Sequence, residues 1–450
     1  QNDLKITTAT ISKTEKSGVK EIPLTRINHH GTLNEVRLHT EGMLYPGEYT
    51  VSLQFEGTIN DKASGLYPSY YKDGDKTEAL YATHFESHHA REVFPSIDEP
   101  AAKASFDLSV RTTTGLTVLS NTDPVSTTDN SDNTTTTTFA TSPLMSTYLL
   151  AFGIGKLHHI EGKTKHGVTL RCWSVTSQPL SHLQYSLDEG IKVLDYYDDY
   201  FKTPFPLSKC DQLALPEFPG GSAAMENWGL VTYREDCMLV DPKNPSLPGQ
   251  QYISLVIAHE LSHQWFGNLV TMEWWDDLWL NESFASVMEH MCLDALHPEW
   301  HQWERYITQD VLAASNRDIY AGVQPVGIEV HHPDEIGSIF DGAIVYAKGG
   351  RLLKMLHDYI GDQAFRVALQ NYFKEHAYKN TRREDLWKAM SQASDKDINA
   401  LMTPWLTQSG MPVLTLSKGS SPKTRTISQK RFVLDKQDDQ QIWPVPLLSE

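Results

Sequence analysis

The residues His259-Glu260-Leu261-Ser262-His263 place two imidazoles and a carboxylate within five positions of the chain. Apolar residues around them, over 253–266, have the spacing of a helix. Residues i and i+4 share one face of a helix, so the two imidazoles point the same way, as two nitrogen ligands of one zinc ion must. The same five residues also fit a helix without a metal, so a third ligand is needed to favour the metal site.

Glu282 is the candidate for that third ligand. Catalytic zinc commonly takes two histidines and one glutamate and leaves its fourth position to water. Glu282 follows His263 with 18 residues between them and begins a second helical pattern over 282–296. A carboxylate on a neighbouring antiparallel helix can face the histidine pair. We therefore expect one Zn²⁺ ion, held by His259, His263 and Glu282.

The residues beside these ligands suggest a hydrolytic chemistry. Zinc lowers the pKa of the water it binds to about 7. Glu260 is adjacent to a ligand, so its carboxylate can reach that water, act as general base and pass the proton to a leaving amine. Asn281 precedes the third ligand, and two interpretations of it stay open: a group that orients the ligand or the N-cap of the helix.

The elements that must position these residues follow from periodicity. Residues 1 to about 175 show short alternating stretches, such as 49–55 and 106–110, and are predicted to form β-structure. The Thr-rich stretch 126–138 is predicted to be a solvated hairpin or loop. A Pro-rich segment, 204–219, ends the first helical pattern, and strands return after Gly410. The predicted helices cover 183–201, 253–266, 282–296, 300–315, 343–360, 362–375 and 383–392.

Composition limits the function classes. The chain has 450 residues, 40% hydrophobic and 21% charged, which is typical of globular domains. A net charge of −18 repels phosphate backbones and excludes nucleic acid as a partner. Neither a bilayer-spanning apolar run nor a signal-peptide pattern is found. The four cysteines are expected to be buried free thiols, which favours the cytoplasm. Paired histidines such as His88-His89 are expected to be surface or loop residues.

Five groups of residues, unrelated to one another in composition, occur in a fixed order along the chain. They are Ala90-Arg91-x-x-Phe94-Pro95-x-x-Asp98-Glu99-Pro100, Ala223-Ala224-Met225-Glu226-Asn227-Trp228-Gly229, His259-Glu260-x-x-His263 with Glu282, Gly267-Asn268-Leu269-Val270-Thr271-Met272-Glu273-Trp274-Trp275, and Tyr346-Ala347-Lys348-Gly349. Together they resemble the aminopeptidase N family of gluzincin zinc peptidases, which includes alanyl, leucyl and arginyl aminopeptidases and leukotriene hydrolase. The second group is similar to the family's Gly-Ala-Met-Glu-Asn exopeptidase motif, and the resemblance covers nearly the whole chain.

The resemblance implies three further roles. Glu226 is similar to the carboxylate that binds the free α-amine of the substrate, and Glu86 to a second amine-binding acid from the β region. A cation between two fixed carboxylates is anchored by charge-assisted hydrogen bonds. Tyr346 resembles a tyrosine that stabilises the oxyanion opposite zinc. Without the motifs, the plainer interpretations are solvated surface carboxylates and a tyrosine packed in the core.

Five more residues are expected around the substrate because of the resemblance. Ala223 and Ala224 would border the substrate backbone by strand-like pairing, Met225 would form the floor of the first side-chain pocket, and Asn227 completes the motif. Ala223 replaces the family's Gly, and its Cβ can crowd the substrate backbone. His84, where the family often has Gln, is expected near the first side-chain pocket or, alternatively, on the surface.

The expected architecture is a multidomain α+β protein. Residues 1–177 are predicted to form a saddle-like N-terminal β domain, residues 178–410 a thermolysin-like zinc catalytic domain, and residues 411–450 the beginning of a C-terminal β-sandwich. Compared with the family, the first strands and the large helical domain that roofs the active site are expected to be missing from this sequence. Activity of the 450 residues alone is therefore in question.

The predicted function is a zinc aminopeptidase acting on peptides with a free N-terminus, with the oligomeric state left open. A zinc endopeptidase shares the ligands and would also cleave N-acetylated peptides, but it does not need Glu226. A non-catalytic binding or scaffold member of the family would have lost part of the metal motif and would not bind zinc. An added epoxide-hydrolase activity rests on analogy alone.

Overall fold

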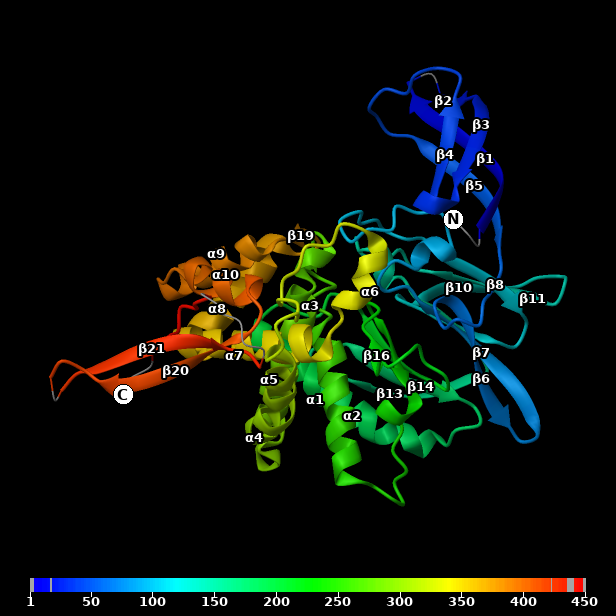
Figure 1. Cartoon of the computed structure of the whole chain (residues 1–450). Helices are drawn as coiled ribbons and strands as arrows, with labels where there is room; N and C mark the ends of the chain where they lie inside the picture. Colours follow the sequence, from blue (N-terminus) through cyan, green and yellow to red (C-terminus); the bar gives the residue numbers. More distant parts are fainter. Residues whose placement is uncertain (1–3, 17, 422, 435–440, 448–450) are drawn as a thin grey trace.

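The computed structural model describes residues 4–16, 18–421, 423–434 and 441–447. The predicted regions 1–177 and 411–450 therefore each include a few residues that lie outside the described part. In Figure 1 the chain runs from a β-rich end, through a mixed central body, to the helices α8–α10 and a projecting hairpin. This order confirms the predicted α+β architecture, with a β-sheet region first, helices next and strands last.

The N-terminal region consists of antiparallel sheets, as its alternating pattern predicts. The Thr-rich stretch forms a hairpin that pairs with β8. The four-stranded sheet matters most for function, because β7 ends at His84, beside the candidate site. The sheet orders are β2-β1-β5 (Gly18–Ile22, Leu4–Glu15, Thr50–Gly57), β3-β4 (Leu24–His30, Glu35–Thr40), β10-β11-β8 (Pro124–Asp129, Thr134–Phe139, Ser109–Thr113) and β6-β7-β12-β9 (Gly65–Asp73, Lys76–His84, Phe152–Gly155, Thr117–Ser120).

A five-stranded mixed sheet joins the two halves of the chain. Its order is β13-β14-β15-β17-β16 (Leu157–Lys163, Thr169–Val175, Lys209–Leu215, Leu230–Arg234, Ala224–Met225). The central strand, β15, is buried along its whole length and is parallel to both neighbours. It lies inside the Pro-rich segment for which no strand was predicted. This sheet crosses the predicted boundary at residue 177, and that boundary stays a prediction.

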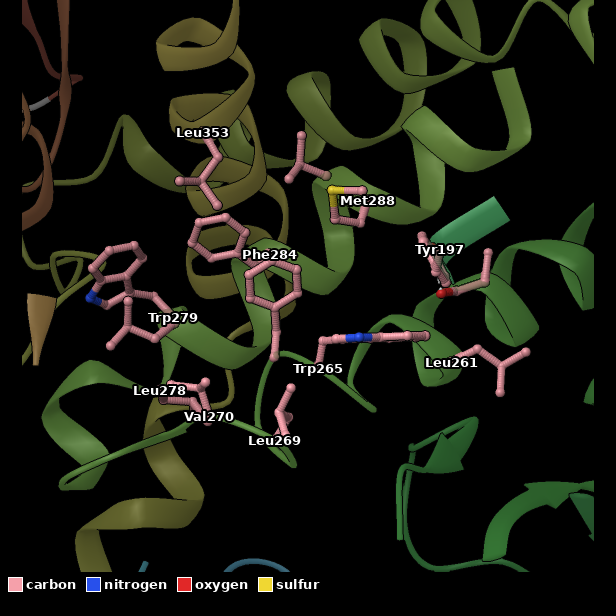
Figure 2. Close-up of a cluster of buried hydrophobic side chains, with 14 of the residues drawn as sticks. Tyr197, Leu261, Trp265, Leu269, Val270, Leu278, Trp279, Phe284, Met288 and Leu353 are labelled. Carbon is pink, nitrogen blue, oxygen red and sulfur yellow. Dashed lines mark hydrogen bonds between the residues drawn. The ribbon is translucent and has the colours of Figure 1, made fainter. Parts of the chain in front are cut away.

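Two buried helices, α2 (Leu247–Ser262) and α3 (Trp279–Leu296), form the centre of the molecule. The N-cap of α2 is Ser246, whose hydroxyl accepts from Gly249 N. Aromatic and aliphatic side chains from the connection between the helices fill the space beside them (Figure 2). Phe266 stacks on Phe284 of α3 with ring centroids 4.3 Å apart. This packing fixes the end of α2 against the start of α3.

The remaining helices surround this pair. They are α1 (Gln184–Phe201), α4 (Gln302–Tyr306), α5 (Leu312–Asp318), α6 (Ile336–Ile339), α7 (Gly349–Ile360), α8 (Asp362–His376), α9 (Arg383–Ser394) and α10 (Ile398–Thr407). A π-helical turn, Ile307–Val311, joins α4 to α5, and a second, Gly342–Lys348, precedes α7. Such turns interrupt the regular α-helical hydrogen bonds and often occur at functional sites.

After residue 410 the chain forms the hairpin of β20 (Met411–Lys418) and β21 (Arg425–Phe432), which confirms the strands predicted there. All four cysteines are buried and free, as predicted. Within the described residues, no helix combines the length and the apolar character that crossing a bilayer requires.

Candidate metal centre and active site

The three predicted metal ligands converge at the end of α2. His259 lies in the last turn of α2, His263 directly follows it, and Glu282 lies in the first turn of α3. The Nε2 atoms of the two histidines are 3.1 Å apart, and Glu282 Oε2 is 3.2 Å from one and 3.4 Å from the other. Three donor atoms of the types that zinc prefers therefore face one point.

The other nitrogen of each imidazole has its own partner, which leaves both Nε2 atoms for a metal. His259 Nδ1 lies 2.6 Å from Glu289 Oε2, and His263 Nδ1 lies 2.9 Å from the carbonyl oxygen of Phe266. Partners of this kind orient the imidazoles of metal sites. Glu289 was not predicted from the sequence. Its signal is its spacing, since it follows Glu282 by seven residues and so lies on the same face of α3.

A cavity of about 780 Å³ opens over these ligands. Ten of the twelve predicted site residues line it: His84, Glu86, Ala223, Ala224, Glu226, His259, Glu260, His263, Glu282 and Tyr346. Glu289 and Asp310 add two carboxylates, and none of the described residues that line the cavity is lysine or arginine. The cavity is therefore suited to a cationic group.

Glu260 lies on α2 beside both histidines. Its Oε2 atom is buried and has no hydrogen-bond partner among the described residues. Burial raises the pKa of Glu260 to about 8, although the two histidines oppose this shift. Burial also raises the pKa of Glu282, but the histidines outweigh burial and lower it to about 2. The two glutamates are thus electrostatically distinct, one an ion paired with the histidines and the other able to exchange a proton near neutral pH.

Glu226 and Glu86 reach the same site from different parts of the chain. Glu226 directly follows the edge strand β16, and Glu86 lies two residues beyond the end of β7. Each has a buried Oε1 without a hydrogen-bond partner among the described residues. Their oxygens and a Glu282 oxygen all lie within 4.8 Å of one another. Burial and, for Glu86, the neighbouring carboxylates raise the pKa of both groups, as expected for anions that lack a cation.

Tyr346 faces the metal ligands from the π-helical turn Gly342–Lys348. Its ring stacks beside that of His259, with centroids 6.0 Å apart and an interplanar angle of 21°. Burial, followed by the nearby carboxylates, raises the pKa of the phenol well above its usual value. The phenol therefore stays protonated and can donate a hydrogen bond into the cavity.

Two members of the predicted motif do not line the cavity. Met225 is buried and packs in the main hydrophobic core. Asn227 is also buried, and its amide donates to Thr232 Oγ1 at 3.3 Å. Their side chains follow the alternation of an extended segment, which turns them away from the side that Ala224 and Glu226 present.

The histidines near the end of β7 lie in the cavity wall. His84 is partly buried, its Nδ1 has no partner among the described residues, and its ring contacts Phe218 edge to face at 5.7 Å. Burial lowers the pKa of His84 to about 4, so its imidazole is neutral. His88 and His89 follow in a loop and also line the cavity. The interpretation of His84 as a surface residue is therefore not supported.

Asn281 is neither an N-cap nor a partner of the metal ligands. Helix α3 begins at Trp279, with Leu278 in the capping position, which rules out the N-cap interpretation. The Asn281 amide instead donates to the hydroxyl of Tyr148 at 3.3 Å, and that hydroxyl donates to the carbonyl oxygen of Gly267 at 3.2 Å. Asn281 thereby links the start of α3 to the loop after His263.

The donor set fits a zinc-type ion. It offers two imidazole nitrogens and one carboxylate, with the second nitrogen of each ring already bonded elsewhere. The buried, unpartnered oxygen of Glu260 lies beside the ligands, where a water molecule would need a base. Two histidines and a glutamate are the ligand set of a catalytic site with an open fourth position.

Comparison with known proteins agrees with this geometry. Residues 185–405 match the model described as the Peptidase family M1 domain, and residues 1–149 match the Peptidase M1 N-terminal domain. Aminopeptidase N of Lactococcus lactis subsp. cremoris (strain MG1363) is 47% identical over 404 residues, covering 89% of this chain and 47% of that protein. The puromycin-sensitive aminopeptidase of Caenorhabditis elegans is 42% identical over 421 residues, covering 92% of this chain and 44% of that protein. The chain spans about half the length of the curated relatives it matches.

Proposed function

This chain belongs to the M1 family of metallopeptidases, and from that premise we propose that it hydrolyses the N-terminal peptide bond of peptides with a free α-amine. The observation that carries the proposal is the pair Glu226 and Glu86. Both present an unpartnered carboxylate oxygen beside the ligand Glu282. A cation bound there lies at a fixed distance from the metal, so only the first peptide bond can reach it.

His259, His263 and Glu282 would hold one zinc ion. When bound, zinc supplies Lewis acidity, which makes water more acidic and polarises a carbonyl group. Glu289 and the carbonyl group of Phe266 hold the two imidazoles in the orientation that this requires.

Glu260 is the proton carrier in this proposal. Its free Oε2 takes a proton from the attacking water and then gives it to the nitrogen of the leaving peptide. A carboxylate buried among other carboxylates binds that proton more readily than one in water, because burial disfavours its charge.

Tyr346 and the alanines position the reacting bond. The Tyr346 phenol donates a hydrogen bond to the carbonyl oxygen as negative charge develops there. Ala223 and Ala224 border the cavity, and Ala224 begins β16, an edge strand paired with β17 on one side only. The backbone of a bound peptide can pair with that edge as an added strand. Ala223, which precedes this strand, lines the cavity, as do His84 and Glu86.

The test is a digest of one short peptide, supplied with a free or an N-acetylated terminus and followed by mass spectrometry. We expect only the free peptide to shorten, one residue at a time. Internal cleavage of both forms would indicate an endopeptidase and contradict the role given to Glu226. No cleavage of either form, together with no zinc binding, would support a non-catalytic family member. A cytoplasmic location stays a prediction.

A further inference from the structure

The position of the Glu226 carboxylate, the proposed amine-binding group, is not set by hydrogen bonds to its free oxygen. Its Oε1 has no hydrogen-bond partner within the described chain, although the side chain is almost completely buried. The imidazole nitrogen His263 Nδ1 lies 3.8 Å from this oxygen, but it already bonds to the carbonyl oxygen of Phe266. An oxygen that must stay free for a ligand cannot be positioned through its own hydrogen bonds. Its position has to be set through the main chain.

Two buried side-chain amides hold that main chain. Asn268 Nδ2 donates to the carbonyl oxygen of Glu226 at 2.8 Å, and Gln264 Nε2 donates to the same oxygen at 3.1 Å. The other end of the Gln264 amide accepts a hydrogen bond from Gly229 N at 3.2 Å. Both side chains are fully buried. They therefore fix the peptide unit that follows Glu226 and the turn after it.

These amides also belong to the segment that carries the metal ligands. Gln264 directly follows His263 and donates to the carbonyl oxygen of Glu260 at 3.2 Å. The backbone N–H of Asn268 donates to the carbonyl oxygen of His263 at 3.1 Å. One short stretch, from His263 to Asn268, thus holds a metal ligand through the backbone and the amine anchor through its side chains.

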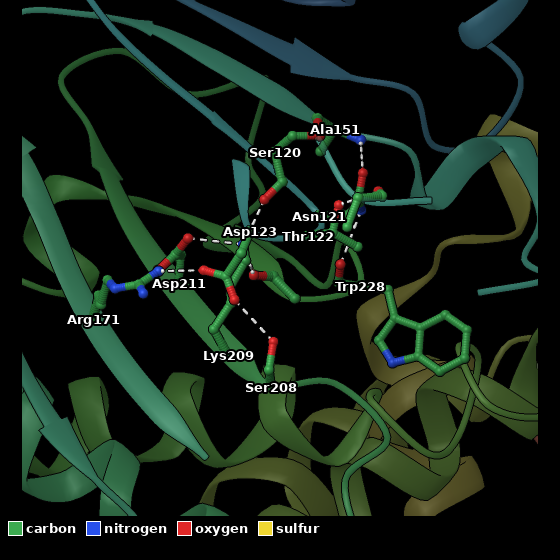
Figure 3. A network of polar contacts seen from close by, with 12 residues as sticks. Ser120, Asn121, Thr122, Asp123, Ala151, Arg171, Ser208, Lys209, Asp211 and Trp228 are labelled. Atoms are coloured by element: carbon green, nitrogen blue, oxygen red, sulfur yellow. Dashed lines mark hydrogen bonds and ion pairs between the residues drawn. The ribbon is translucent and has the colours of Figure 1, made fainter. Parts of the chain in front are cut away.

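The far end of the turn is held by the N-terminal region. Asn121 donates from one amide to the carbonyl oxygens of Leu149 at 2.7 Å and Trp228 at 2.9 Å (Figure 3). The buried ammonium of Lys209 donates to the carbonyl oxygens of Ser120 and Gly229. Gly229 has φ +77°, and a Cβ there would lie 2.4 Å from the carbonyl oxygen of Asn121. The turn after Glu226 is thereby fixed at both ends.

We propose that Gln264 and Asn268 are positioning residues that set the distance between the α-amine of the substrate and the metal. The inference rests on the proposed function, since it requires that Glu226 bind that amine. Neither side chain touches the substrate. Both act through the Glu226 carbonyl group, so their loss should weaken recognition of the amine and leave the metal site intact.

Two hydroxamates separate these effects in the full-length, zinc-loaded protein. Acetohydroxamate has a metal-binding group only, and glycine hydroxamate adds an α-amine to the same skeleton. The inhibition constant of the compound without the amine, divided by that of the compound with it, measures how much the amine contributes to binding. The variants are Asn268→Leu and Gln264→Met, which keep side-chain size and remove the hydrogen bonds. The matched control is Asn380→Leu, because Asn380 also donates to two carbonyl oxygens, those of Pro100 and Met272, but does not line the cavity.

We expect the ratio to fall roughly tenfold in each variant, as for the loss of one well-oriented charge-assisted hydrogen bond. The acetohydroxamate constant should change less than about twofold, and the Asn380→Leu ratio should equal that of the wild type. Should one variant not fold, the other tests the same prediction.

Three results would contradict the inference. An unchanged ratio in the folded variants would overturn the positioning role and leave the proposed function intact. An equal loss for both hydroxamates would show that the amides maintain the metal site instead. A wild-type ratio near one would overturn the amine-binding role of Glu226 itself, and with it both proposals.

Discussion

Glu289 Oε2 lies 2.6 Å from Nδ1 of His259, across the imidazole ring from the Nε2 atom that faces His263 and Glu282. A carboxylate in this position fixes the tautomer of the histidine and makes its free nitrogen a better ligand. Glu289 also contacts His290, at 3.4 Å. Two turns of one helix thus supply both a candidate metal ligand, Glu282, and the group that orients another candidate ligand, His259.

Replacement of Glu289 by alanine should weaken metal binding by roughly 10- to 100-fold. Competition with a chromophoric chelator measures this affinity directly. The matched control is Glu189→Ala, because Glu189 Oε1 lies 2.5 Å from His297 Nε2 but does not line the cavity. An equal loss of affinity in both variants would point to general destabilisation and not to a contact with the ligand.

Replacement of Glu260 by glutamine should lower kcat by roughly 10²- to 10⁴-fold, the range for loss of a general base. The metal content should not change, because the three ligands remain. Steady-state kinetics together with elemental analysis of the purified protein test both statements. Loss of metal along with activity would mean that Glu260 helps to hold the ion, and the general-base role would then be unsupported.

Replacement of Tyr346 by phenylalanine should lower kcat by roughly 10²- to 10³-fold and leave KM nearly unchanged, since the phenol acts on charge that develops only in the transition state. The control is Tyr185→Phe, which removes a hydroxyl that bonds to Ser254 Oγ at 2.8 Å outside the cavity. A rise in KM without a fall in kcat would place Tyr346 in substrate binding alone.

His84 should make stability depend on pH. Its folded pKa, about 4, is below the value of about 6.5 for an unfolded chain. As the pH falls below 6.5, His84 therefore becomes protonated in the unfolded state while it stays neutral in the folded state. The free energy of unfolding decreases as a result. At pH 5.5 this effect is at most about 1.4 kcal/mol.

Between pH 7 and pH 5.5, the melting temperature of the His84→Gln variant should accordingly fall by less than that of the wild type. Differential scanning calorimetry at both pH values gives the comparison. His301→Gln is the control, because that side chain is 70% exposed. A larger fall in the melting temperature of the His84→Gln variant than in that of the wild type would mean that His84 is protonated in the folded protein.

The convergence of His259, His263 and Glu282 can be predicted from the sequence because it depends on local geometry. The two histidines lie one turn apart at the end of α2, and Glu282 lies in the first turn of α3, so spacing alone brings them together. The helical patterns over 183–201 and 282–296 also correspond closely to α1 and α3. Glu226, Glu86 and Tyr346 come from separate elements, and only the resemblance indicated that they belong to one site.

Other features depend on contacts that no local pattern contains. Strand β15 carries Lys209, Asp211 and Gln212, which resemble surface residues in the sequence but are all buried. Lys209 and Asp211 form an ion pair at 2.8 Å. The Lys209 ammonium also donates to the carbonyl oxygen of Gly229, and the Gln212 amide oxygen accepts from the hydroxyl of Tyr233. Glu289 was missed for a similar reason, because a single glutamate on a helix usually faces solvent and α3 is buried on nearly all sides.

The hydrogen bonds from Asn121 to Leu149 and Trp228 have a consequence for protein engineering. Shuffling of domains between relatives assumes that each domain keeps its own properties. Here a residue of the N-terminal region closes the turn that follows Glu226. A chimera joined between residues 149 and 185 would therefore take the turn from one parent and the residue that closes it from the other. Exchange of specificity by recombination should succeed only when the sequences around 120–121 and 226–229 come from the same parent.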